Sequence, residues 1–241
     1  LGGKNPNIIM SDADLEIAIP GVIDGMRYTR QGQACTAGSR VYIHEKNYDK
    51  VLDGAVKKLS KLKMGNALDE NSDIGAIISE EQLKRTLYYM DIAKKNPSTK
   101  ILHGGNQSKG GEYKDGFYYE PTLLSGLPVS SPVCQEEVFG PVACAIPFKS
   151  FDEVMKSAND TQFGLSAVLW TKDLSRALQF VDEIEAGFVQ VNQCVAPRAN
   201  VSYGGIKMSG LGKEYAFDSM MNHFTQSKTV LINRGKSNID K

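Results

Sequence analysis

The 241-residue sequence contains little cysteine and little histidine, and each shortage excludes a class of protein. Its four cysteines include no Cys-X-X-Cys pair and are too few for a disulfide scaffold. Its three histidines share no spacing with the cysteines that would indicate a zinc site, so we expect no bound metal. We therefore expect free thiols in a reducing compartment, and the cytoplasm is the compartment that this indicates.

The sequence also lacks net charge, with 28 basic and 28 acidic residues. Without an excess of one sign there is no electrostatic attraction to nucleic acid or to an anionic membrane, and we expect neither partner. No apolar run approaches the roughly 20 residues of a membrane helix. The chain starts at Leu1 without a charged and apolar leader, so we expect its natural start, and any targeting segment, to lie upstream.

Hydrophobic spacing alternates between the helical and the strand period along the chain. Helices are predicted from Leu15 to near Arg30, from Tyr48 to Leu62, after the capping residues Ser79 and Ser150, and over 173–184. Strands are predicted over 40–44, 142–148, 165–171 and 188–191, and a loop or hairpin over 104–119. This alternation predicts an α/β fold with an open, mostly parallel sheet flanked by helices. A β-branched run over 227–232 predicts a strand that extends away and pairs with its own sheet, another domain or another subunit.

Two short runs contain residue types suited to chemistry. Cys35 lies among glycines and small polar residues, which are poor core material but expose backbone N–H groups that favour the reactive thiolate. Cys35 is therefore a candidate nucleophile, with a buried structural thiol as the alternative. Residues 136–141 set Glu136 and Glu137 beside Phe139 and a Gly-Pro turn, which suits a flat, polyhydroxylated ligand. A solvated loop is the alternative for this run.

These runs, with the opening Leu1-Gly2-Gly3-Lys4, resemble the catalytic half of the NAD(P)-dependent aldehyde dehydrogenases. Gly32-Gln33-Ala34-Cys35 matches the family's Gly-Gln-X-Cys signature, and residues 204–210 match its Gly-Gly-X-Lys-X-Ser-Gly segment. The resemblance is collinear from Leu1 to Ile232. It implies an oxidoreductase that converts a small aldehyde to its carboxylic acid with NAD or NADP.

The resemblance also implies a role for each matching residue. Cys35 attacks the carbonyl to form a thiohemiacetal and then a thioester, and its backbone N–H is one oxyanion donor. Glu137 binds the ribose hydroxyls of the nicotinamide nucleotide, and Phe139 braces the nicotinamide. Asn192 belongs to the wall of the active site, and Glu214 helps to move protons. From the residues alone, a strand-end turn residue and a surface carboxylate are the alternatives for the last two.

In the family, the general base directly precedes the Leu-Gly-Gly-Lys run, and the dinucleotide-binding domain lies further upstream. The resemblance therefore implies that residues 1–208 are a catalytic domain and residues 209–241 a returning helix and oligomerisation strand. For the longer protein we expect a homodimer or homotetramer. For the 241-residue chain alone we expect no dehydrogenase turnover, because no Gly-X-Gly-X-X-Gly motif follows a predicted strand and the base lies outside it.

Two other functions stay open on the sequence. A stand-alone cysteine hydrolase or esterase would require a histidine close to Cys35 in space, and none of the three histidines lies in a motif. A relative without catalytic activity would have no need of an intact Cys35 or of Glu137-Val138-Phe139. The sequence predicts neither which aldehyde is the substrate nor whether NAD or NADP is the cofactor.

Overall fold

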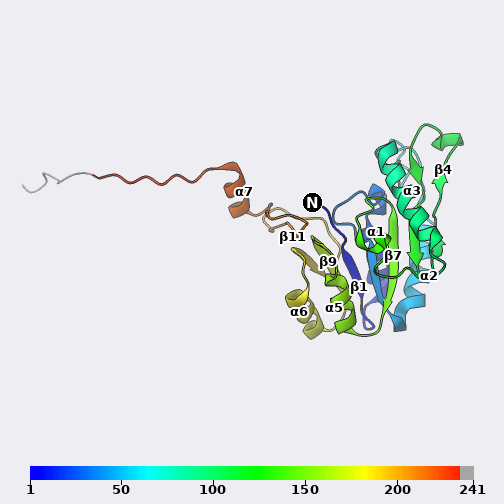
Figure 1. Ribbon diagram of the computed structural model, residues 1–241, viewed down its shortest axis with the longest axis horizontal. Coiled ribbons are helices and arrows are strands. Elements are labelled where there is room, and N and C mark those ends of the chain that lie inside the picture. Colours follow the sequence, from blue (N-terminus) through cyan, green and yellow to red (C-terminus); the bar gives the residue numbers. More distant parts are fainter. Residues whose placement is uncertain (234–241) are drawn as a thin grey trace, which may run out of the picture.

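The structure is a computed structural model that describes residues 1–233, and a seven-stranded sheet forms its centre (Figure 1). The strand order is β10-β9-β1-β2-β7-β6-β3, and all neighbours are parallel except β3, which is antiparallel to β6. This confirms the predicted open, mostly parallel sheet. Its strands are β1 Pro6–Ile9, β2 Arg40–His44, β3 Lys100–His103, β6 Thr122–Ser125, β7 Val142–Phe148, β9 Ser166–Trp170 and β10 Phe188–Val191.

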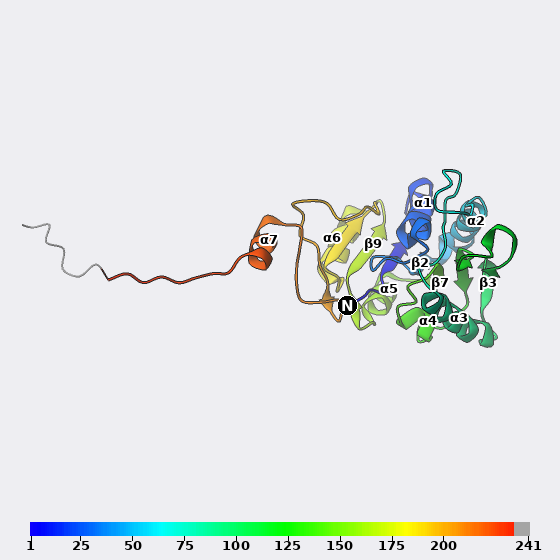
Figure 2. The same cartoon turned by 90° about the horizontal axis from the view of Figure 1, so that it is seen from above.

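Helices cover both faces of the sheet. Helices α1 and α2 pack on one face and α3 to α6 on the other, and Figure 2 shows α1 and α2 opposite α3 and α4. Successive strand residues point to opposite faces, so Ile8 joins the core under α3 to α6 and Ile9 joins the core under α1 and α2. The helices are α1 Leu15–Met26, α2 Tyr48–Leu59, α3 Glu80–Lys95, α4 Pro132–Gln135, α5 Phe151–Asn159, α6 Leu174–Glu183 and α7 Phe217–Phe224.

Helix starts agree with the capping residues in the sequence. The hydroxyl of Ser79 accepts a hydrogen bond from the N–H of Gln82 at 3.2 Å, and Ser150 caps α5 in the same way. The first helix is shorter than predicted because Arg27 has a left-handed backbone, with φ +58°, which ends it at Met26. A short 3₁₀ turn over Tyr28–Arg30 follows and leads into the loop that contains Cys35.

Strand β1 was not predicted, although it lies at the centre of the sheet between β9 and β2. All four of its residues are buried, so it shows no alternation of polar and apolar positions. Two short antiparallel pairs complete the strands: β4 Gln107–Ser108 with β5 Tyr118–Tyr119, and β8 Phe163–Gly164 with β11 Ile206–Lys207. The first pair lies in the segment predicted as a loop or hairpin.

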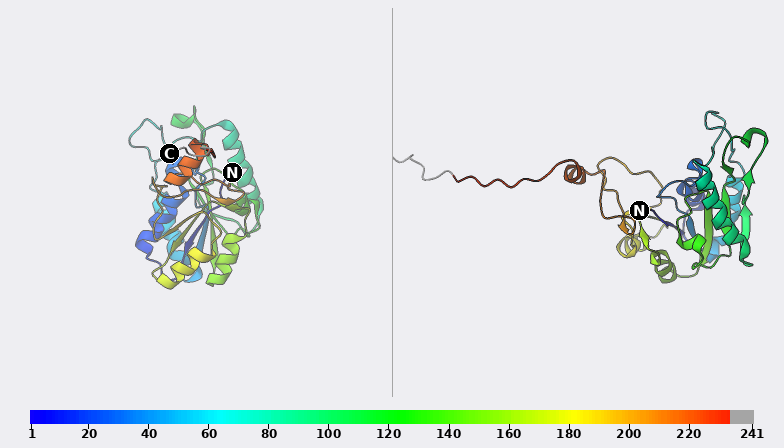
Figure 3. Two further views of the ribbon diagram at one scale, coloured as in Figure 1. Left: turned by 90° about the vertical axis from the view of Figure 1, so that its left-hand side faces the viewer. Right: turned by 45° about the horizontal axis from the view of Figure 1, so that its top comes forward.

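The C-terminal part leaves the body of the molecule (Figures 1 and 3). Helix α7 buries none of its residues, and residues 225–233 run outward beyond it. The strand predicted over 227–232 is not formed, because a strand requires a neighbour and nothing within residues 1–233 pairs with this segment. Residues 234–241 of the predicted tail lie outside the described residues. Within residues 1–233, every helix is too short or too polar to cross a membrane.

Candidate active site

Three of the predicted site residues, Cys35, Glu137 and Phe139, gather where the parallel strands begin. Cys35 lies in the loop before β2, Gly2 and Gly3 lie just before β1, and Glu137 and Phe139 lie just before β7. Because neighbouring parallel strands start at the same edge of a sheet, three segments far apart in the sequence meet there. We refer to this edge as the amino edge.

Asn5 fixes the backbone on both sides of Cys35. Its side-chain Nδ2 donates to the carbonyl oxygens of Cys35, at 2.8 Å, and Ala37, at 2.9 Å. Its Oδ1 accepts from the N–H of Ser166 at 2.9 Å, which ties the Cys35 loop to the start of β9. Gly3 passes so close that a Cβ there would overlap the carbonyl oxygen of Cys35. Since Asn5 is only 3% exposed, the loop is held by a fully satisfied buried amide.

The side chain of Cys35 is exposed and opens into a cavity of about 290 Å³. Its Sγ lies 3.5 Å from the hydroxyl oxygen of Tyr203. Leu165 and Glu214 also line this cavity, together with Leu1, Gly2 and the glycine-rich segment 204–212. The structure thus brings Cys35 and Glu214, two of the predicted site residues, to one cavity large enough for a small organic molecule.

Tyr203 was missed by the sequence analysis. Its ring packs edge-on against Phe188, with centroids 5.4 Å apart, and against Tyr215, with centroids 5.8 Å apart. Its backbone exchanges two hydrogen bonds with Glu214, at 2.7 and 2.9 Å. Burial raises the pKa of the Tyr203 phenol, and the hydrogen bond with Cys35 raises it further. Since 168 residues separate Tyr203 from Cys35, no local pattern could have paired them.

Glu137 is joined to the Cys35 loop through the first residues of the chain. Its Oε1 accepts the N–H of Gly3 at 3.0 Å, and its Oε2 faces the bare α-carbon of Gly2, where a Cβ would lie 2.6 Å away. Burial raises the pKa of this half-buried carboxyl, although the Gly3 N–H and the charge of Lys4 oppose the shift.

Phe139 lies in a constrained turn beside this carboxylate. Its φ of +55° is in the left-handed region, and Gln82 holds the turn by donating to the carbonyl oxygens of Val138, at 3.0 Å, and Phe139, at 2.8 Å. A Cβ on Gly32 would overlap the carbonyl oxygen of Gly140. The Cys35 loop and the Phe139 turn are therefore in direct backbone contact.

Asn192 lies elsewhere. It follows β10 and so stands at the opposite, carboxyl edge of the sheet. Its side-chain amide donates to the carbonyl oxygen of Thr171 at 2.7 Å and accepts from the N–H of Thr171 at 3.0 Å. Both ends of the amide thus tie β10 to the end of β9. The structure does not bring Asn192 to the Cys35 cavity, and it favours the strand-end reading of this residue.

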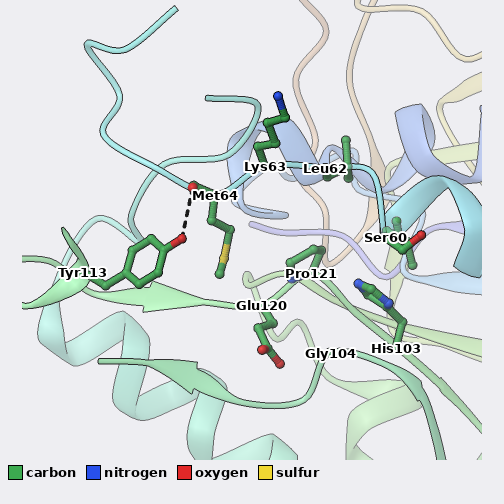
Figure 4. A pocket seen from close by; sticks show the side chains of 10 residues that line it. Ser60, Leu62, Lys63, Met64, His103, Gly104, Tyr113, Glu120 and Pro121 are labelled. Atoms are coloured by element: carbon green, nitrogen blue, oxygen red, sulfur yellow. Dashed lines mark hydrogen bonds between the residues drawn. The ribbon is translucent and has the colours of Figure 1, made fainter. Parts of the chain in front are cut away.

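A larger cavity of about 490 Å³ lies between the end of α2 and the end of β3 (Figure 4). His103 and Glu120 line it, and Tyr113 donates to the carbonyl oxygen of Met64 at 3.3 Å. Burial lowers the pKa of His103, and the charge of Glu120 opposes this shift. None of the predicted site residues lines this cavity, so the smaller one is the candidate active site. In the described part of the chain, no three His, Cys, Asp or Glu side chains are grouped as a metal site would require.

Comparison with known proteins finds similarity over nearly the whole chain. The aldehyde dehydrogenase family matches residues 1–230. An aldehyde dehydrogenase of Rhodospirillum rubrum is 38% identical over 238 residues, covering 96% of this chain and 46% of the relative. A betaine aldehyde dehydrogenase of Brucella melitensis is 36% identical, covering 98% and 48%. The crystal structure of a Staphylococcus aureus betaine aldehyde dehydrogenase in complex with NAD+ is 35% identical, with a TM-score of 0.88 over 92% of this chain and 44% of that one. The chain therefore spans about half the length of the curated relatives it matches.

Proposed function

Because the chain belongs to the aldehyde dehydrogenase family, we propose that it contributes the nucleophile-bearing half of an enzyme that oxidises an aldehyde to its carboxylic acid. One observation carries this proposal: the exposed Cys35 thiol opens into the 290 Å³ cavity that Glu214 and Tyr203 also line. NAD or NADP is the proposed cofactor. The NAD+ complex of the Staphylococcus aureus relative supports it.

The first step is addition of the Cys35 thiolate to the aldehyde carbon. A sulfur electron pair forms the S–C bond, and the electrons of the C=O double bond move to oxygen. Among residues 1–233, the backbone N–H of Cys35 has no hydrogen-bond acceptor, so it is available to the new oxyanion. Asn5 fixes the carbonyl of the same residue and so restrains the loop that contains this N–H.

The second step converts the thiohemiacetal on Cys35 to a thioester. When bound, the dinucleotide supplies the two-electron acceptor for this oxidation. The residues here fit such a group, because Glu137 turns a half-buried carboxylate oxygen towards the bare face of Gly2 at the edge of the cavity. We propose that this carboxylate accepts hydrogen bonds from the ribose hydroxyls and that Phe139 braces the nicotinamide ring.

The last step is hydrolysis of the thioester. Water adds to the acyl carbon, the C–S bond breaks, and the carboxylic acid leaves as the Cys35 thiol is restored. We propose that Glu214 relays protons during this step, because it lines the same cavity as Cys35. No histidine among the described residues lines this cavity, and His223 approaches its lining residue Gly212. The hydrogen-bond partner of the Cys35 sulfur is Tyr203, not the histidine that the alternative cysteine hydrolase would require.

We further propose that residues 1–208 are the catalytic domain and residues 209–241 an oligomerisation segment of a homodimer or homotetramer. Phe217 and Phe224 of α7 are 71% and 79% exposed, and Leu231 is 93% exposed. A series of exposed large apolar side chains is typical of a surface that another subunit covers. Deleting residues 225–241 is expected to reduce the molar mass of the assembly, measured by light scattering, to that of a monomer. An unchanged molar mass would contradict the assignment of this segment to oligomerisation.

The proposed chemistry can be tested in a fusion protein. Residues 1–241 are placed behind the part of the Staphylococcus aureus betaine aldehyde dehydrogenase that they do not match, and NADH formation from propanal or betaine aldehyde is followed. We expect turnover that Cys35→Ser abolishes and that Cys194→Ser, a partly buried thiol outside the cavity, leaves unchanged. Turnover that persists in Cys35→Ser would refute the proposal.

A further inference from the structure

We propose that Tyr203 is a catalytic residue whose hydroxyl donates a hydrogen bond to the Cys35 sulfur and stabilises it as the thiolate. The contact is direct, with 3.5 Å between the hydroxyl oxygen of Tyr203 and the Sγ of Cys35. This inference rests on the proposed function, because it takes Cys35 as the nucleophile. It assigns a second residue that lines the same cavity to the same step.

The direction of the hydrogen bond follows from the state of the phenol. Burial, and then the neighbouring Cys35, raise the pKa of Tyr203, so its oxygen keeps the proton at pH values where a thiol ionises. A protonated phenol beside a thiolate can act only as the donor, because the thiolate has no proton to give. Other ionisable groups surround the pair. Arg27 lies at the end of α1 and Tyr215 beside the ring. Glu214, whose backbone is paired with that of Tyr203, and the amino terminus at Leu1 belong to residues that line the cavity. The Arg27 charge opposes the shift of the Tyr203 pKa, and Tyr215 adds to it.

The phenol ring is held in place independently of Cys35. Phe188, at the start of β10, and Tyr215 both pack edge-on against it. Its backbone is paired with Glu214, and the next residue, Gly204, packs so closely on Gly212 that a Cβ would overlap the carbonyl oxygen there. A donor fixed by such contacts requires little reorganisation when charge develops beside it.

The hydrogen bond acts at both ends of the reaction. Before attack it stabilises the negative charge on the attacking sulfur. During attack the sulfur electron pair enters the S–C bond and the negative charge moves to the carbonyl oxygen. When the thioester is hydrolysed, the C–S bond breaks and its electron pair returns to sulfur, where the Tyr203 O–H again faces a developing thiolate. Tyr203 keeps its own proton throughout, so no further reactant is required.

The test is the alkylation of Cys35 by iodoacetamide, measured by peptide mass mapping across a range of pH in the 241-residue chain and in Tyr203→Phe. Phenylalanine keeps the two ring contacts and removes only the hydroxyl. Loss of one charge-assisted hydrogen bond is expected to lower the thiolate fraction about tenfold at neutral pH. The released thiolate is about threefold more nucleophilic, because nucleophilicity rises with basicity with a Brønsted slope of about 0.5.

The two profiles are therefore expected to cross. Tyr203→Phe alkylates about threefold more slowly near neutral pH and about threefold faster at high pH, where every Cys35 is ionised. Tyr215→Phe is the matched control, because it loses a hydroxyl of the same aromatic cluster that is not hydrogen-bonded to Cys35. Its profile should stay much closer to that of the unsubstituted chain than the profile of Tyr203→Phe. Superimposed profiles, or a rate lowered by one factor at every pH, would overturn the proposal.

A second variant covers the case in which Tyr203→Phe does not fold. A fluorotyrosine incorporated at position 203 is a stronger donor, and it should shift the alkylation profile to lower pH; an unchanged profile would overturn the proposal. Because this assay uses no aldehyde and no NAD+, it separates the two ideas. Crossing profiles without Cys35-dependent oxidation in the fusion would remove the proposed function and leave the Tyr203–Cys35 hydrogen bond standing. Cys35-dependent oxidation together with superimposed profiles would support the proposed function and remove the Tyr203–Cys35 hydrogen bond.

Discussion

Replacing Asn5 by alanine should disturb the site and the fold together. Asn5 makes three hydrogen bonds from a position that is 3% exposed: two to the backbone around Cys35 and one to the start of β9. Each buried hydrogen bond contributes about 1 kcal/mol, and the three partners would be left without Asn5. The expected loss in free energy of unfolding is therefore about 3 kcal/mol for Asn5→Ala.

Asn7 provides the matched control. It lies two residues further along, is fully buried, and makes two side-chain hydrogen bonds, to the carbonyl oxygen of Gly21 at 3.1 Å and from the indole of Trp170 at 2.7 Å. Asn7→Ala should cost about 2 kcal/mol. Neither of its partners belongs to the Cys35 loop, so the loss of stability should come without a loss of reactivity.

Two assays separate these effects. Urea unfolding measures stability, and a loss of about 3 kcal/mol corresponds to a midpoint lowered by about 1.5 M for a slope of about 2 kcal/mol per M. Acetylation of Cys35 by p-nitrophenyl acetate measures reactivity, and we expect it to slow about tenfold in Asn5→Ala because the loop loses its fixed geometry. The reasoning is refuted if Asn5→Ala unfolds at the same urea concentration as the unsubstituted chain, or if both variants slow acetylation equally.

Three further predictions concern the surroundings of the site. Gly32→Ala should destabilise the chain by about 3 kcal/mol, because φ is +64° and a Cβ would overlap the carbonyl oxygen of Gly140. Gly110→Ala, where φ is +80° but the space around a Cβ is open, should cost about 1 kcal/mol. Equal urea midpoints for the two variants would contradict this prediction. Burial raises the pKa of Glu137 in the folded chain, so the unfolded chain releases this proton first and stability falls as pH rises from 4.5 to the folded value. The free energy of unfolding of Glu137→Gln, relative to that of the unsubstituted chain, should therefore increase between these two pH values and stay constant above them. A difference in free energy of unfolding that does not depend on pH would rule this out. Finally, the 241-residue chain alone should be acetylated at Cys35 by p-nitrophenyl acetate but form no NADH from propanal; turnover close to that of the fusion would show this expectation to be wrong.

Local features of the fold could be read from the sequence, and features set by distant residues could not. Ser79 and Ser150 mark helix starts because the capping hydrogen bond joins residues only three apart. Strand β1 has no such local mark: it is four residues long, starts with Pro6 and is buried on both faces. The segment over 227–232 has the composition of a strand, but composition cannot supply the neighbour that a strand requires.

The same distinction applies to the site. Cys35, Glu137 and Phe139 are found through short runs, and the structure places these runs next to one another. The position of the Cys35 cavity relative to the sheet could not be predicted. Ligands of open α/β sheets usually bind where the strands end, and this cavity lies where they begin. That reversal also explains Asn192, which follows a strand and so stands at the far edge. Tyr203 depends on a contact across 168 residues, which only the folded chain reveals.

The central claim is that the Cys35 sulfur bonds covalently to the aldehyde carbon during oxidation. Acid-quenching the fusion protein during turnover of propanal with NAD+, followed by peptide mass mapping, tests it most directly. The account predicts a propionyl group on the peptide that contains Cys35, appearing with turnover and absent without NAD+. Sustained NADH formation with an unmodified Cys35 peptide, or with the acyl group on another cysteine, would contradict it.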